Sequence, residues 1–151
     1  MAAVSNCAAR IDPPVDELDL SGVLLRTDYT DDDRFTKVLA DSRRPAGAHG
    51  VYGAKLLVVE DPCLARITPE QIIELVDVED FAFVADARSM VDSTLLVVDL
   101  FEDSDTYLTA FRVIPEAVFV VEANLVLANL DFADLLDVAG SDGVFRETFG
   151  L

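Results

Sequence analysis

The sequence predicts an α/β protein, at the border with the α+β class, with a mixed sheet of about five strands and three to four flanking helices. Three observations predict this class. In the first half of the chain, apolar runs of strand length alternate with amphipathic segments of helix length, which favours parallel pairing. Two central apolar runs, Phe81–Ala85 and Leu95–Leu100, are separated by too few residues for a full helix. The later run of strands requires an antiparallel hairpin, so the sheet is mixed.

The two central runs are the best candidates for buried strands. Both consist mainly of Val, Leu, Phe and Ala, and each ends at or beside an aspartate. Continuous apolar runs of this length are typical of strands covered on both faces. Three further strands are predicted, the last as a hairpin partner of Leu95–Leu100: Val23–Arg26, Lys55–Glu60 and Tyr107–Val113.

Two helices are predicted in the first half of the chain. The first runs from about residue 31 to 41, because Thr30 and Asp33 have capping-box spacing and the apolar residues that follow share one face. The second begins at Thr68-Pro69-Glu70-Gln71, which combines a cap residue, a proline at the first position and a glutamine that can reach back. We expect this helix to end near Asp77.

The second half holds two more helical segments. A short helix is predicted from Pro115 to about Glu122, followed by an extended piece at Leu125–Leu127, although this region is ambiguous between helix and strand. Asp131 is the expected cap of the last helix, and Gly140 stands where a C-terminal cap belongs.

The chain length fits one domain. Residues 1–20 are interpreted as a flexible N-terminal arm, because small residues lead into an acidic stretch in which Pro13 and Pro14 block a helix. Residues 21–151 form the single globular domain. Phe145 and Phe149 predict that the C-terminal tail packs against it.

The charge balance narrows the possible partners. The 151 residues carry 29 acidic and 11 basic side chains, a formal net charge of −18. Because 52% of the residues are hydrophobic, this charge belongs on the surface of a folded core rather than to a disordered chain. Such a surface repels phosphate backbones and anionic lipids, so neither nucleic acid nor a membrane is an expected partner. A basic protein, a cationic ligand or a divalent metal would be attracted; solubility alone is the other explanation.

The two cysteines, Cys7 and Cys63, fit no metal-binding or redox spacing. We therefore predict two reduced thiols in a cytoplasmic protein. The first residues lack the basic and apolar regions of a signal peptide. No apolar run approaches the roughly 20 residues of a membrane span.

Several stretches together resemble a bacterial family of small acidic proteins that is catalogued only as a domain of unknown function. The resemblance covers about residues 22–147, and the stretches that carry it are LLRTDYTDD, ITPEQ, FVADARSM, LLVVDL, FRVIPEAV, EANLVLANLDFADLLD and DGVFRE. The chain departs from the family pattern at Ala123, Val126 and Leu130, where Asn, Ser and Met are common. The resemblance implies a fold-level grouping and supplies no catalytic residue and no cofactor.

The first candidate site is a carboxylate cluster formed by Asp28, Asp86 and Asp99, each at or just beyond the end of a predicted strand. If the first and central strands run parallel, two or three of these carboxylates could meet at one sheet edge, where α/β proteins bind ligands, and could hold Mg²⁺ or Ca²⁺. The alternative is that aspartate ends strands because it favours turns.

Two further groups are candidates for binding a partner. Asp31, Asp32 and Asp33 open a helix and could contact a basic protein, or could serve only as caps and dipole compensation. Asn124, Asn129 and Asp131 could form a partner-binding edge, or fix a bend through bonds to the backbone.

His49 lies in a loop with Arg43 and Arg44, and a lone loop histidine is most often solvated. The chain contains no phosphate-binding glycine loop, nucleophile elbow or zinc-protease motif. We therefore expect a non-enzymatic protein-binding domain of the immunity or inhibitor type, without a cofactor. A divalent-metal enzyme using the strand-end aspartates and a structural oligomer are the alternatives.

Overall fold

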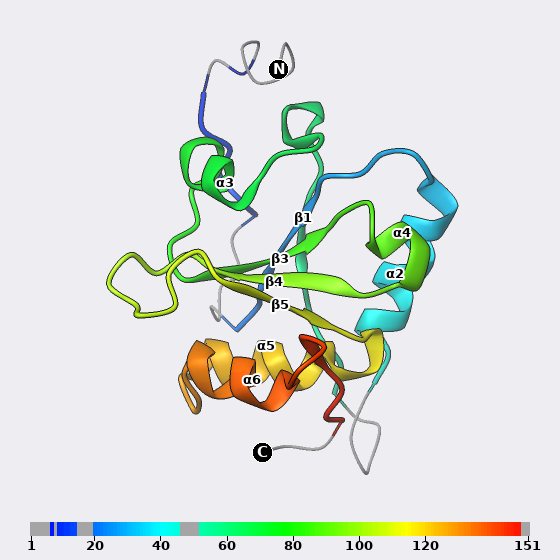
Figure 1. The fold of residues 1–151 in the computed structure, drawn as a ribbon. Coiled ribbons are helices and arrows are strands. Elements are labelled where there is room, and N and C mark those ends of the chain that lie inside the picture. The colour runs from blue at the N-terminus through cyan, green and yellow to red at the C-terminus, as the bar shows by residue number, and fades with distance from the viewer. Residues whose placement is uncertain (1–6, 8, 15–19, 46–51, 149–151) are drawn as a thin grey trace.

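A six-stranded mixed sheet lies at the centre of the computed structural model, which describes residues 7, 9–14, 20–45 and 52–148 (Figure 1). The strands lie in the order β2-β1-β3-β4-β5-β6. Their bounds are β1 Val23–Arg26, β2 Leu57–Val59, β3 Phe81–Ala85, β4 Leu95–Asp99, β5 Ala110–Val113 and β6 Val144–Phe145.

The strand directions divide the sheet into two parts. β1 pairs in parallel with both β2 and β3, whereas β4 is antiparallel to both β3 and β5. β6 returns parallel to β5. The predicted mixed α/β sheet is therefore confirmed. It has one strand more than expected, because the C-terminal tail packs as a strand through Val144 and Phe145. Phe149 lies outside the described residues.

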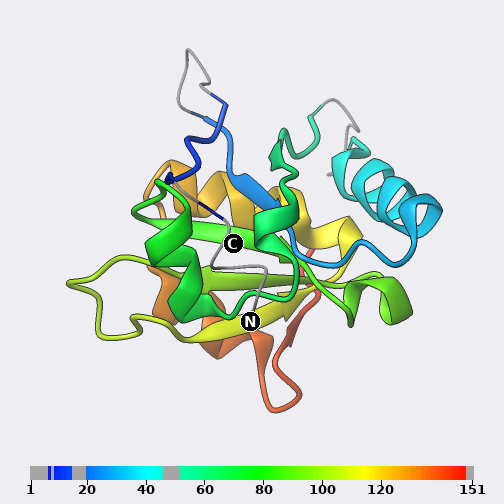
Figure 2. The ribbon, with the colours of Figure 1, turned by 90° about the horizontal axis from the view of Figure 1, so that it is seen from above.

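Helices cover both faces of this sheet. Their bounds, with two 3₁₀ turns labelled η, are α2 Asp32–Arg43, η1 Pro62–Leu64, α3 Pro69–Leu75, α4 Ser89–Asp92, η2 Pro115–Ala117, α5 Val118–Val126 and α6 Phe132–Ala139. One core cluster contains Phe83, Phe111 and Phe145 and lies under α5 and α6. The other contains Leu25 and Val84 and lies under η1 and α3, the side that faces the viewer in Figure 2. No helix in the described part of the chain is long and apolar enough to cross a membrane.

The predicted caps are confirmed at two helices. Thr68 with Gln71, and Asp131 with Asp134, form reciprocal capping boxes at α3 and α6. At α2 the cap is Asp31, whose side chain accepts a hydrogen bond from the backbone N–H of Arg34. The prediction based on Thr30 was thus one residue early.

The predicted extended piece at Leu125–Leu127 was wrong, because α5 continues to Val126. Its sequence obscures the helix, since α5 is buried on more than one side and therefore lacks amphipathic periodicity. The predicted strand Tyr107–Val113 was too long: β5 begins at Ala110, and turns occupy the preceding residues.

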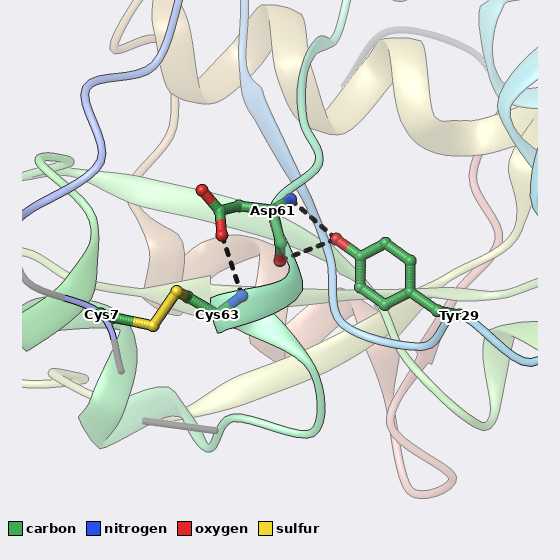
Figure 3. Close-up of a disulfide and its surroundings, with 4 residues drawn as sticks. All are labelled: Cys7, Tyr29, Asp61 and Cys63. Atoms are coloured by element: carbon green, nitrogen blue, oxygen red, sulfur yellow. Dashed lines mark hydrogen bonds between the residues drawn. A yellow bond between two sulfur atoms is a disulfide. The ribbon is translucent and has the colours of Figure 1, made fainter. Parts of the chain in front are cut away.

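The prediction of two reduced thiols was also wrong. Cys7 and Cys63 form a disulfide across 56 positions of the sequence, with their Cα atoms 5.9 Å apart (Figure 3). Ile11 also forms a parallel bridge with Val76. The described residues of the N-terminal arm are therefore attached to the domain beside η1 and α3.

Candidate functional site

The strand register does not bring the three candidate metal ligands together. Arg26 pairs with Ala85, so Asp28 and Asp86 follow β1 and β3 at the same edge of the sheet. By edge we mean here the side of the sheet at which strand ends lie, not an outer strand. Asp99 pairs with Phe81 at the start of β3, which places it at the opposite edge. β1 and β3 are parallel as the prediction required, but all three carboxylates could meet only if β4 were parallel as well, and the short link between β3 and β4 permits only a reversal of direction. In the part of the chain that the structure describes, no group of three or more metal-ligating side chains could hold an ion.

Asp86 is engaged with a buried arginine instead. Arg112 on β5 donates two hydrogen bonds to its carboxylate, with N···O distances of 2.6 and 2.8 Å. The Ser89 hydroxyl also donates to it. Burial lowers the pKa of Arg112, while the Asp86 charge opposes that shift. Bidentate geometry of this kind fixes orientation, so this pair ties β3 to β5 across β4.

A second network at the same edge surrounds α4. Burial raises the pKa of Asp92, but hydrogen bonds from Thr94 and Arg88 outweigh this effect and lower it to about 2. Thr94 also accepts a hydrogen bond from Arg112. Asp86 and Asp92 therefore stabilise the loops at this edge through internal hydrogen bonds.

The acidic start of α2 is likewise occupied by internal contacts. The Arg26 guanidinium lies 4.6 Å from the Tyr29 ring centroid and 4.4 Å from that of Phe35. It also donates to the Asp32 carboxylate at 2.6 Å. Asp31 caps the helix, as described above, and Asp33 is exposed.

The clearest candidate site lies at the other edge of the sheet. A groove of about 490 Å³ opens between the loop after β4 and the turn between α5 and α6, at the end of the sheet where the yellow-green loop projects in Figure 1. Its volume is in the range of ligand sites, roughly 300–1,000 Å³. Its lining residues are Asp80, Phe81, Asp99, Phe101, Ser104, Asp105, Thr106, Leu125, Val126, Ala128, Leu130, Asp131, Phe132 and Ala133.

Asp99 fixes one wall of this groove. Its side chain accepts hydrogen bonds from the hydroxyls of Ser104 and Thr106, both at 2.6 Å, and from the backbone N–H of Phe101 at 3.0 Å. Asp99 is only 2% exposed. It therefore holds the Phe101–Thr106 loop in shape and is not itself presented to a ligand.

The remaining carboxylates of the groove face solvent. Asp80, Asp105 and Asp131 are exposed, and no lysine or arginine is among the lining residues. In the described part of the chain, salt bridges engage Asp32, Asp41, Glu60, Asp77, Asp86, Asp92 and Asp142. None of these belongs to the groove, so its charge is not neutralised by the described side chains.

The groove also presents apolar surface. Phe81, Leu125 and Leu130 line it, while Phe101 and Leu127 stand at or beside its rim with 49% and 56% of their surface exposed. A smaller hollow of about 160 Å³ shares Asp80, Phe81, Leu125 and Val126 with it and adds the exposed Glu79. Acidic and apolar surface therefore run together along this edge.

The predicted partner-binding residues are divided between the two edges. Asp131 lines the groove and Asn129 is exposed in the adjacent turn. Asn124 is buried and donates to the backbone carbonyl of Val120, so its role is structural. Asp31, Asp32 and Asp33 lie at the opposite edge, after β1. His49 lies outside the described residues.

Sequence reasoning missed Asp80, Phe101 and Asp105 as site residues. They occur in short turns whose acidic composition is normal for a connection. One feature of the sequence could have indicated this site. Phe101 is a large apolar residue directly before four acidic or polar residues, a position where burial is not expected.

Comparison with known families gives a match over most of the chain. The model for Domain of unknown function (DUF6924) matches residues 21–148. The chain belongs to this family. No curated protein and no solved structure matches it. The DUF6924 domain includes every residue of the groove and Cys63, whereas Cys7 and the rest of the arm precede it.

Proposed function

We propose that this DUF6924 domain is a non-enzymatic binding protein whose groove receives a basic segment of a partner protein, in the manner of an immunity protein or inhibitor. The observation that carries the proposal is that unneutralised carboxylates and exposed apolar side chains share one concave surface. An apolar pocket alone would fit many ligands, and acidic residues alone are consistent with solubility. Their combination selects a segment that carries both lysine or arginine and an apolar anchor.

The two kinds of surface have different roles in such a complex. The net charge of −18 would steer a basic partner toward the domain and accelerate association, an effect that salt screens. Burial of an apolar anchor between Phe101 and Leu130 would slow dissociation, because well-packed central contacts dominate binding energy. Charge therefore controls the encounter, and the groove controls how long the complex lasts.

The test uses synthetic peptides of about twelve residues, in which two leucines or phenylalanines are flanked by lysine and arginine. An otherwise identical peptide with glutamate in place of the cations serves as the comparison. The groove variant is Asp80→Asn with Asp105→Asn. Its matched control is Glu70→Gln with Glu74→Gln on α3, which removes the same charge from exposed positions outside the groove.

We expect the basic peptides to bind and the acidic one not to. Removing two charges close to the peptide should weaken affinity about tenfold, equivalent to about 1.4 kcal/mol. The control should lose only the small long-range contribution. Equal weakening by both double variants would show that the overall charge and not the groove binds the peptide, and absence of binding by any basic peptide would refute the proposal.

A further inference from the structure

Among the described residues of the N-terminal arm, Arg10 and Ile11 contact the domain in addition to the disulfide, and Ile11 packs against the core cluster of Leu25 and Val84. The Arg10 guanidinium donates to the backbone carbonyls of Ile73 and Val76 at 2.9 and 3.0 Å, at the C-terminal end of α3. Ile11 exchanges two backbone hydrogen bonds with the same segment: its N–H donates to the Leu75 carbonyl, and its carbonyl accepts from the Asp77 N–H. Arg10 is exposed and Ile11 is partly buried, so these bonds lie nearer the surface than those of the central sheet, and such bonds open more readily.

The disulfide is the covalent part of this attachment. Cys63 lies in η1, directly after the exposed Pro62, and both cysteines are only partly buried. Both residues therefore keep some solvent exposure, and access is one of the conditions that make a disulfide labile. Cys7 precedes the residues that the family model matches, whereas Cys63 lies within them.

The surroundings of Cys63 connect it to the sheet edge. Asp61 accepts a hydrogen bond from the backbone N–H of Cys63 through its side chain. The backbone of the same Asp61 is bonded to the Tyr29 hydroxyl in both directions, at 2.8 and 2.9 Å (Figure 3). η1 is thus anchored independently of Cys7, and it should keep its place when the disulfide opens.

From these observations we propose that Cys7–Cys63 is a thiol–disulfide exchange site, and that its reduction releases the arm from the end of α3 while the domain stays folded. This inference is independent of the groove and of its partner. The co-reactant is a dithiol. One of its thiolates attacks a sulfur of the pair, so that a mixed disulfide forms and the other cysteine leaves as a thiolate.

The second thiol of the dithiol then attacks the mixed disulfide. This step releases the remaining cysteine and leaves the dithiol oxidised to its own disulfide, so two electrons and two protons pass to Cys7 and Cys63. With the covalent link gone, the contacts that remain among the described residues 9–14 are the Ile11–Val76 bridge, the packing of Ile11 against the core cluster of Leu25 and Val84, and the bonds of the exposed Arg10. Terminal segments that are not tied down are poorly ordered, so we expect these contacts to open.

The experiment treats the full chain with dithiothreitol under native conditions and counts free thiols by mass after alkylation. Amide hydrogen exchange then follows Asp77, whose N–H is bonded to the arm, with Phe83 and Val97 as reporters of the intact sheet. Limited trypsin digestion reports on the Arg10–Ile11 bond. The double variant Cys7→Ser with Cys63→Ser provides a permanently open form.

We expect two thiols per chain on reduction, exchange of the Asp77 amide about tenfold faster or more, and faster cleavage after Arg10, with Phe83 and Val97 still protected. The double variant should behave like the reduced protein and should not respond to dithiothreitol. Three results would overturn the inference: a bond that resists the reductant in the folded protein, an Asp77 amide that is unaffected by reduction, or loss of protection at Phe83 and Val97 together with Asp77.

Discussion

Replacement of Glu122 by glutamine tests how one buried carboxylate organises the starts of two strands. Glu122 lies on α5, is 3% exposed, and accepts three backbone hydrogen bonds of 3.0 Å each. One oxygen takes the N–H groups of Gly22 and Leu56, and the other takes that of Lys55. The carboxylate thereby fixes the residues that precede β1 and β2 against α5.

A glutamine can place its single carbonyl oxygen toward only one side of this arrangement. If it keeps the two buried donors, its amide group faces the Lys55 N–H, which loses its acceptor at a cost of about 1 kcal/mol. The two retained bonds lose their ionic character, at about 0.5–1 kcal/mol each. We therefore expect Glu122→Gln to lower the free energy of unfolding by about 2–3 kcal/mol.

Urea unfolding followed by circular dichroism measures this change. With a slope of about 2 kcal/mol per molar, the midpoint should fall by about 1 M or slightly more. Glu116→Gln is the matched control, because Glu116 is exposed and close to the same helix; it should change stability by less than about 0.5 kcal/mol. If the two variants unfold at the same urea concentration, the assigned role of Glu122 is incorrect.

Three further predictions concern stability. Asp86→Ala leaves the buried Arg112 charge without its partner. It should lower the free energy of unfolding, measured by chemical denaturation, by about 3–5 kcal/mol, whereas a decrease below about 1 kcal/mol would show that the pair is dispensable. The pKa of Asp92 is lowered to about 2. Its contribution to the free energy of unfolding is therefore complete above the pKa of an unfolded-state aspartate, about 4, and is lost as the pH falls toward 2. After allowance for its partial exposure, this contribution is about 1 kcal/mol. In Asp92→Asn the free energy of unfolding should therefore fall by about 1 kcal/mol less between pH 4 and pH 2 than in the unchanged protein; an identical pH dependence would contradict the lowered pKa. The double variant Cys7→Ser with Cys63→Ser should unfold about 2–4 kcal/mol more easily than the oxidised protein, as expected for a loop of this length, and should match the reduced protein in thermal unfolding.

The fold was predictable to the extent that its elements carry local signals. Phe81–Ala85 and Leu95–Asp99 are continuous apolar runs, and Thr68 and Asp131 are followed by the residues that complete a capping box. The helical state of Leu125 was not predictable from periodicity, because burial on several sides removes the amphipathic pattern.

The candidate site was less predictable, because it depends on strand direction and on distant contacts. Asp28, Asp86 and Asp99 look equivalent as residues at strand ends, and only the antiparallel β4 separates the third from the others. The disulfide joins positions 56 residues apart, and no spacing rule reveals such a pair. Asp131 was identified from its cap position, but its neighbours in the groove come from two other connections.

Chemical-shift mapping of the labelled domain, during titration with a basic, leucine-containing peptide, shows whether the groove is the surface that binds the partner. We expect saturable shifts concentrated at Asp80, Phe101–Asp105 and Leu125–Asp131, reduced by salt, with little change at Asp31–Asp33. Shifts spread over the acidic surface, or concentrated at the start of α2, would contradict this expectation.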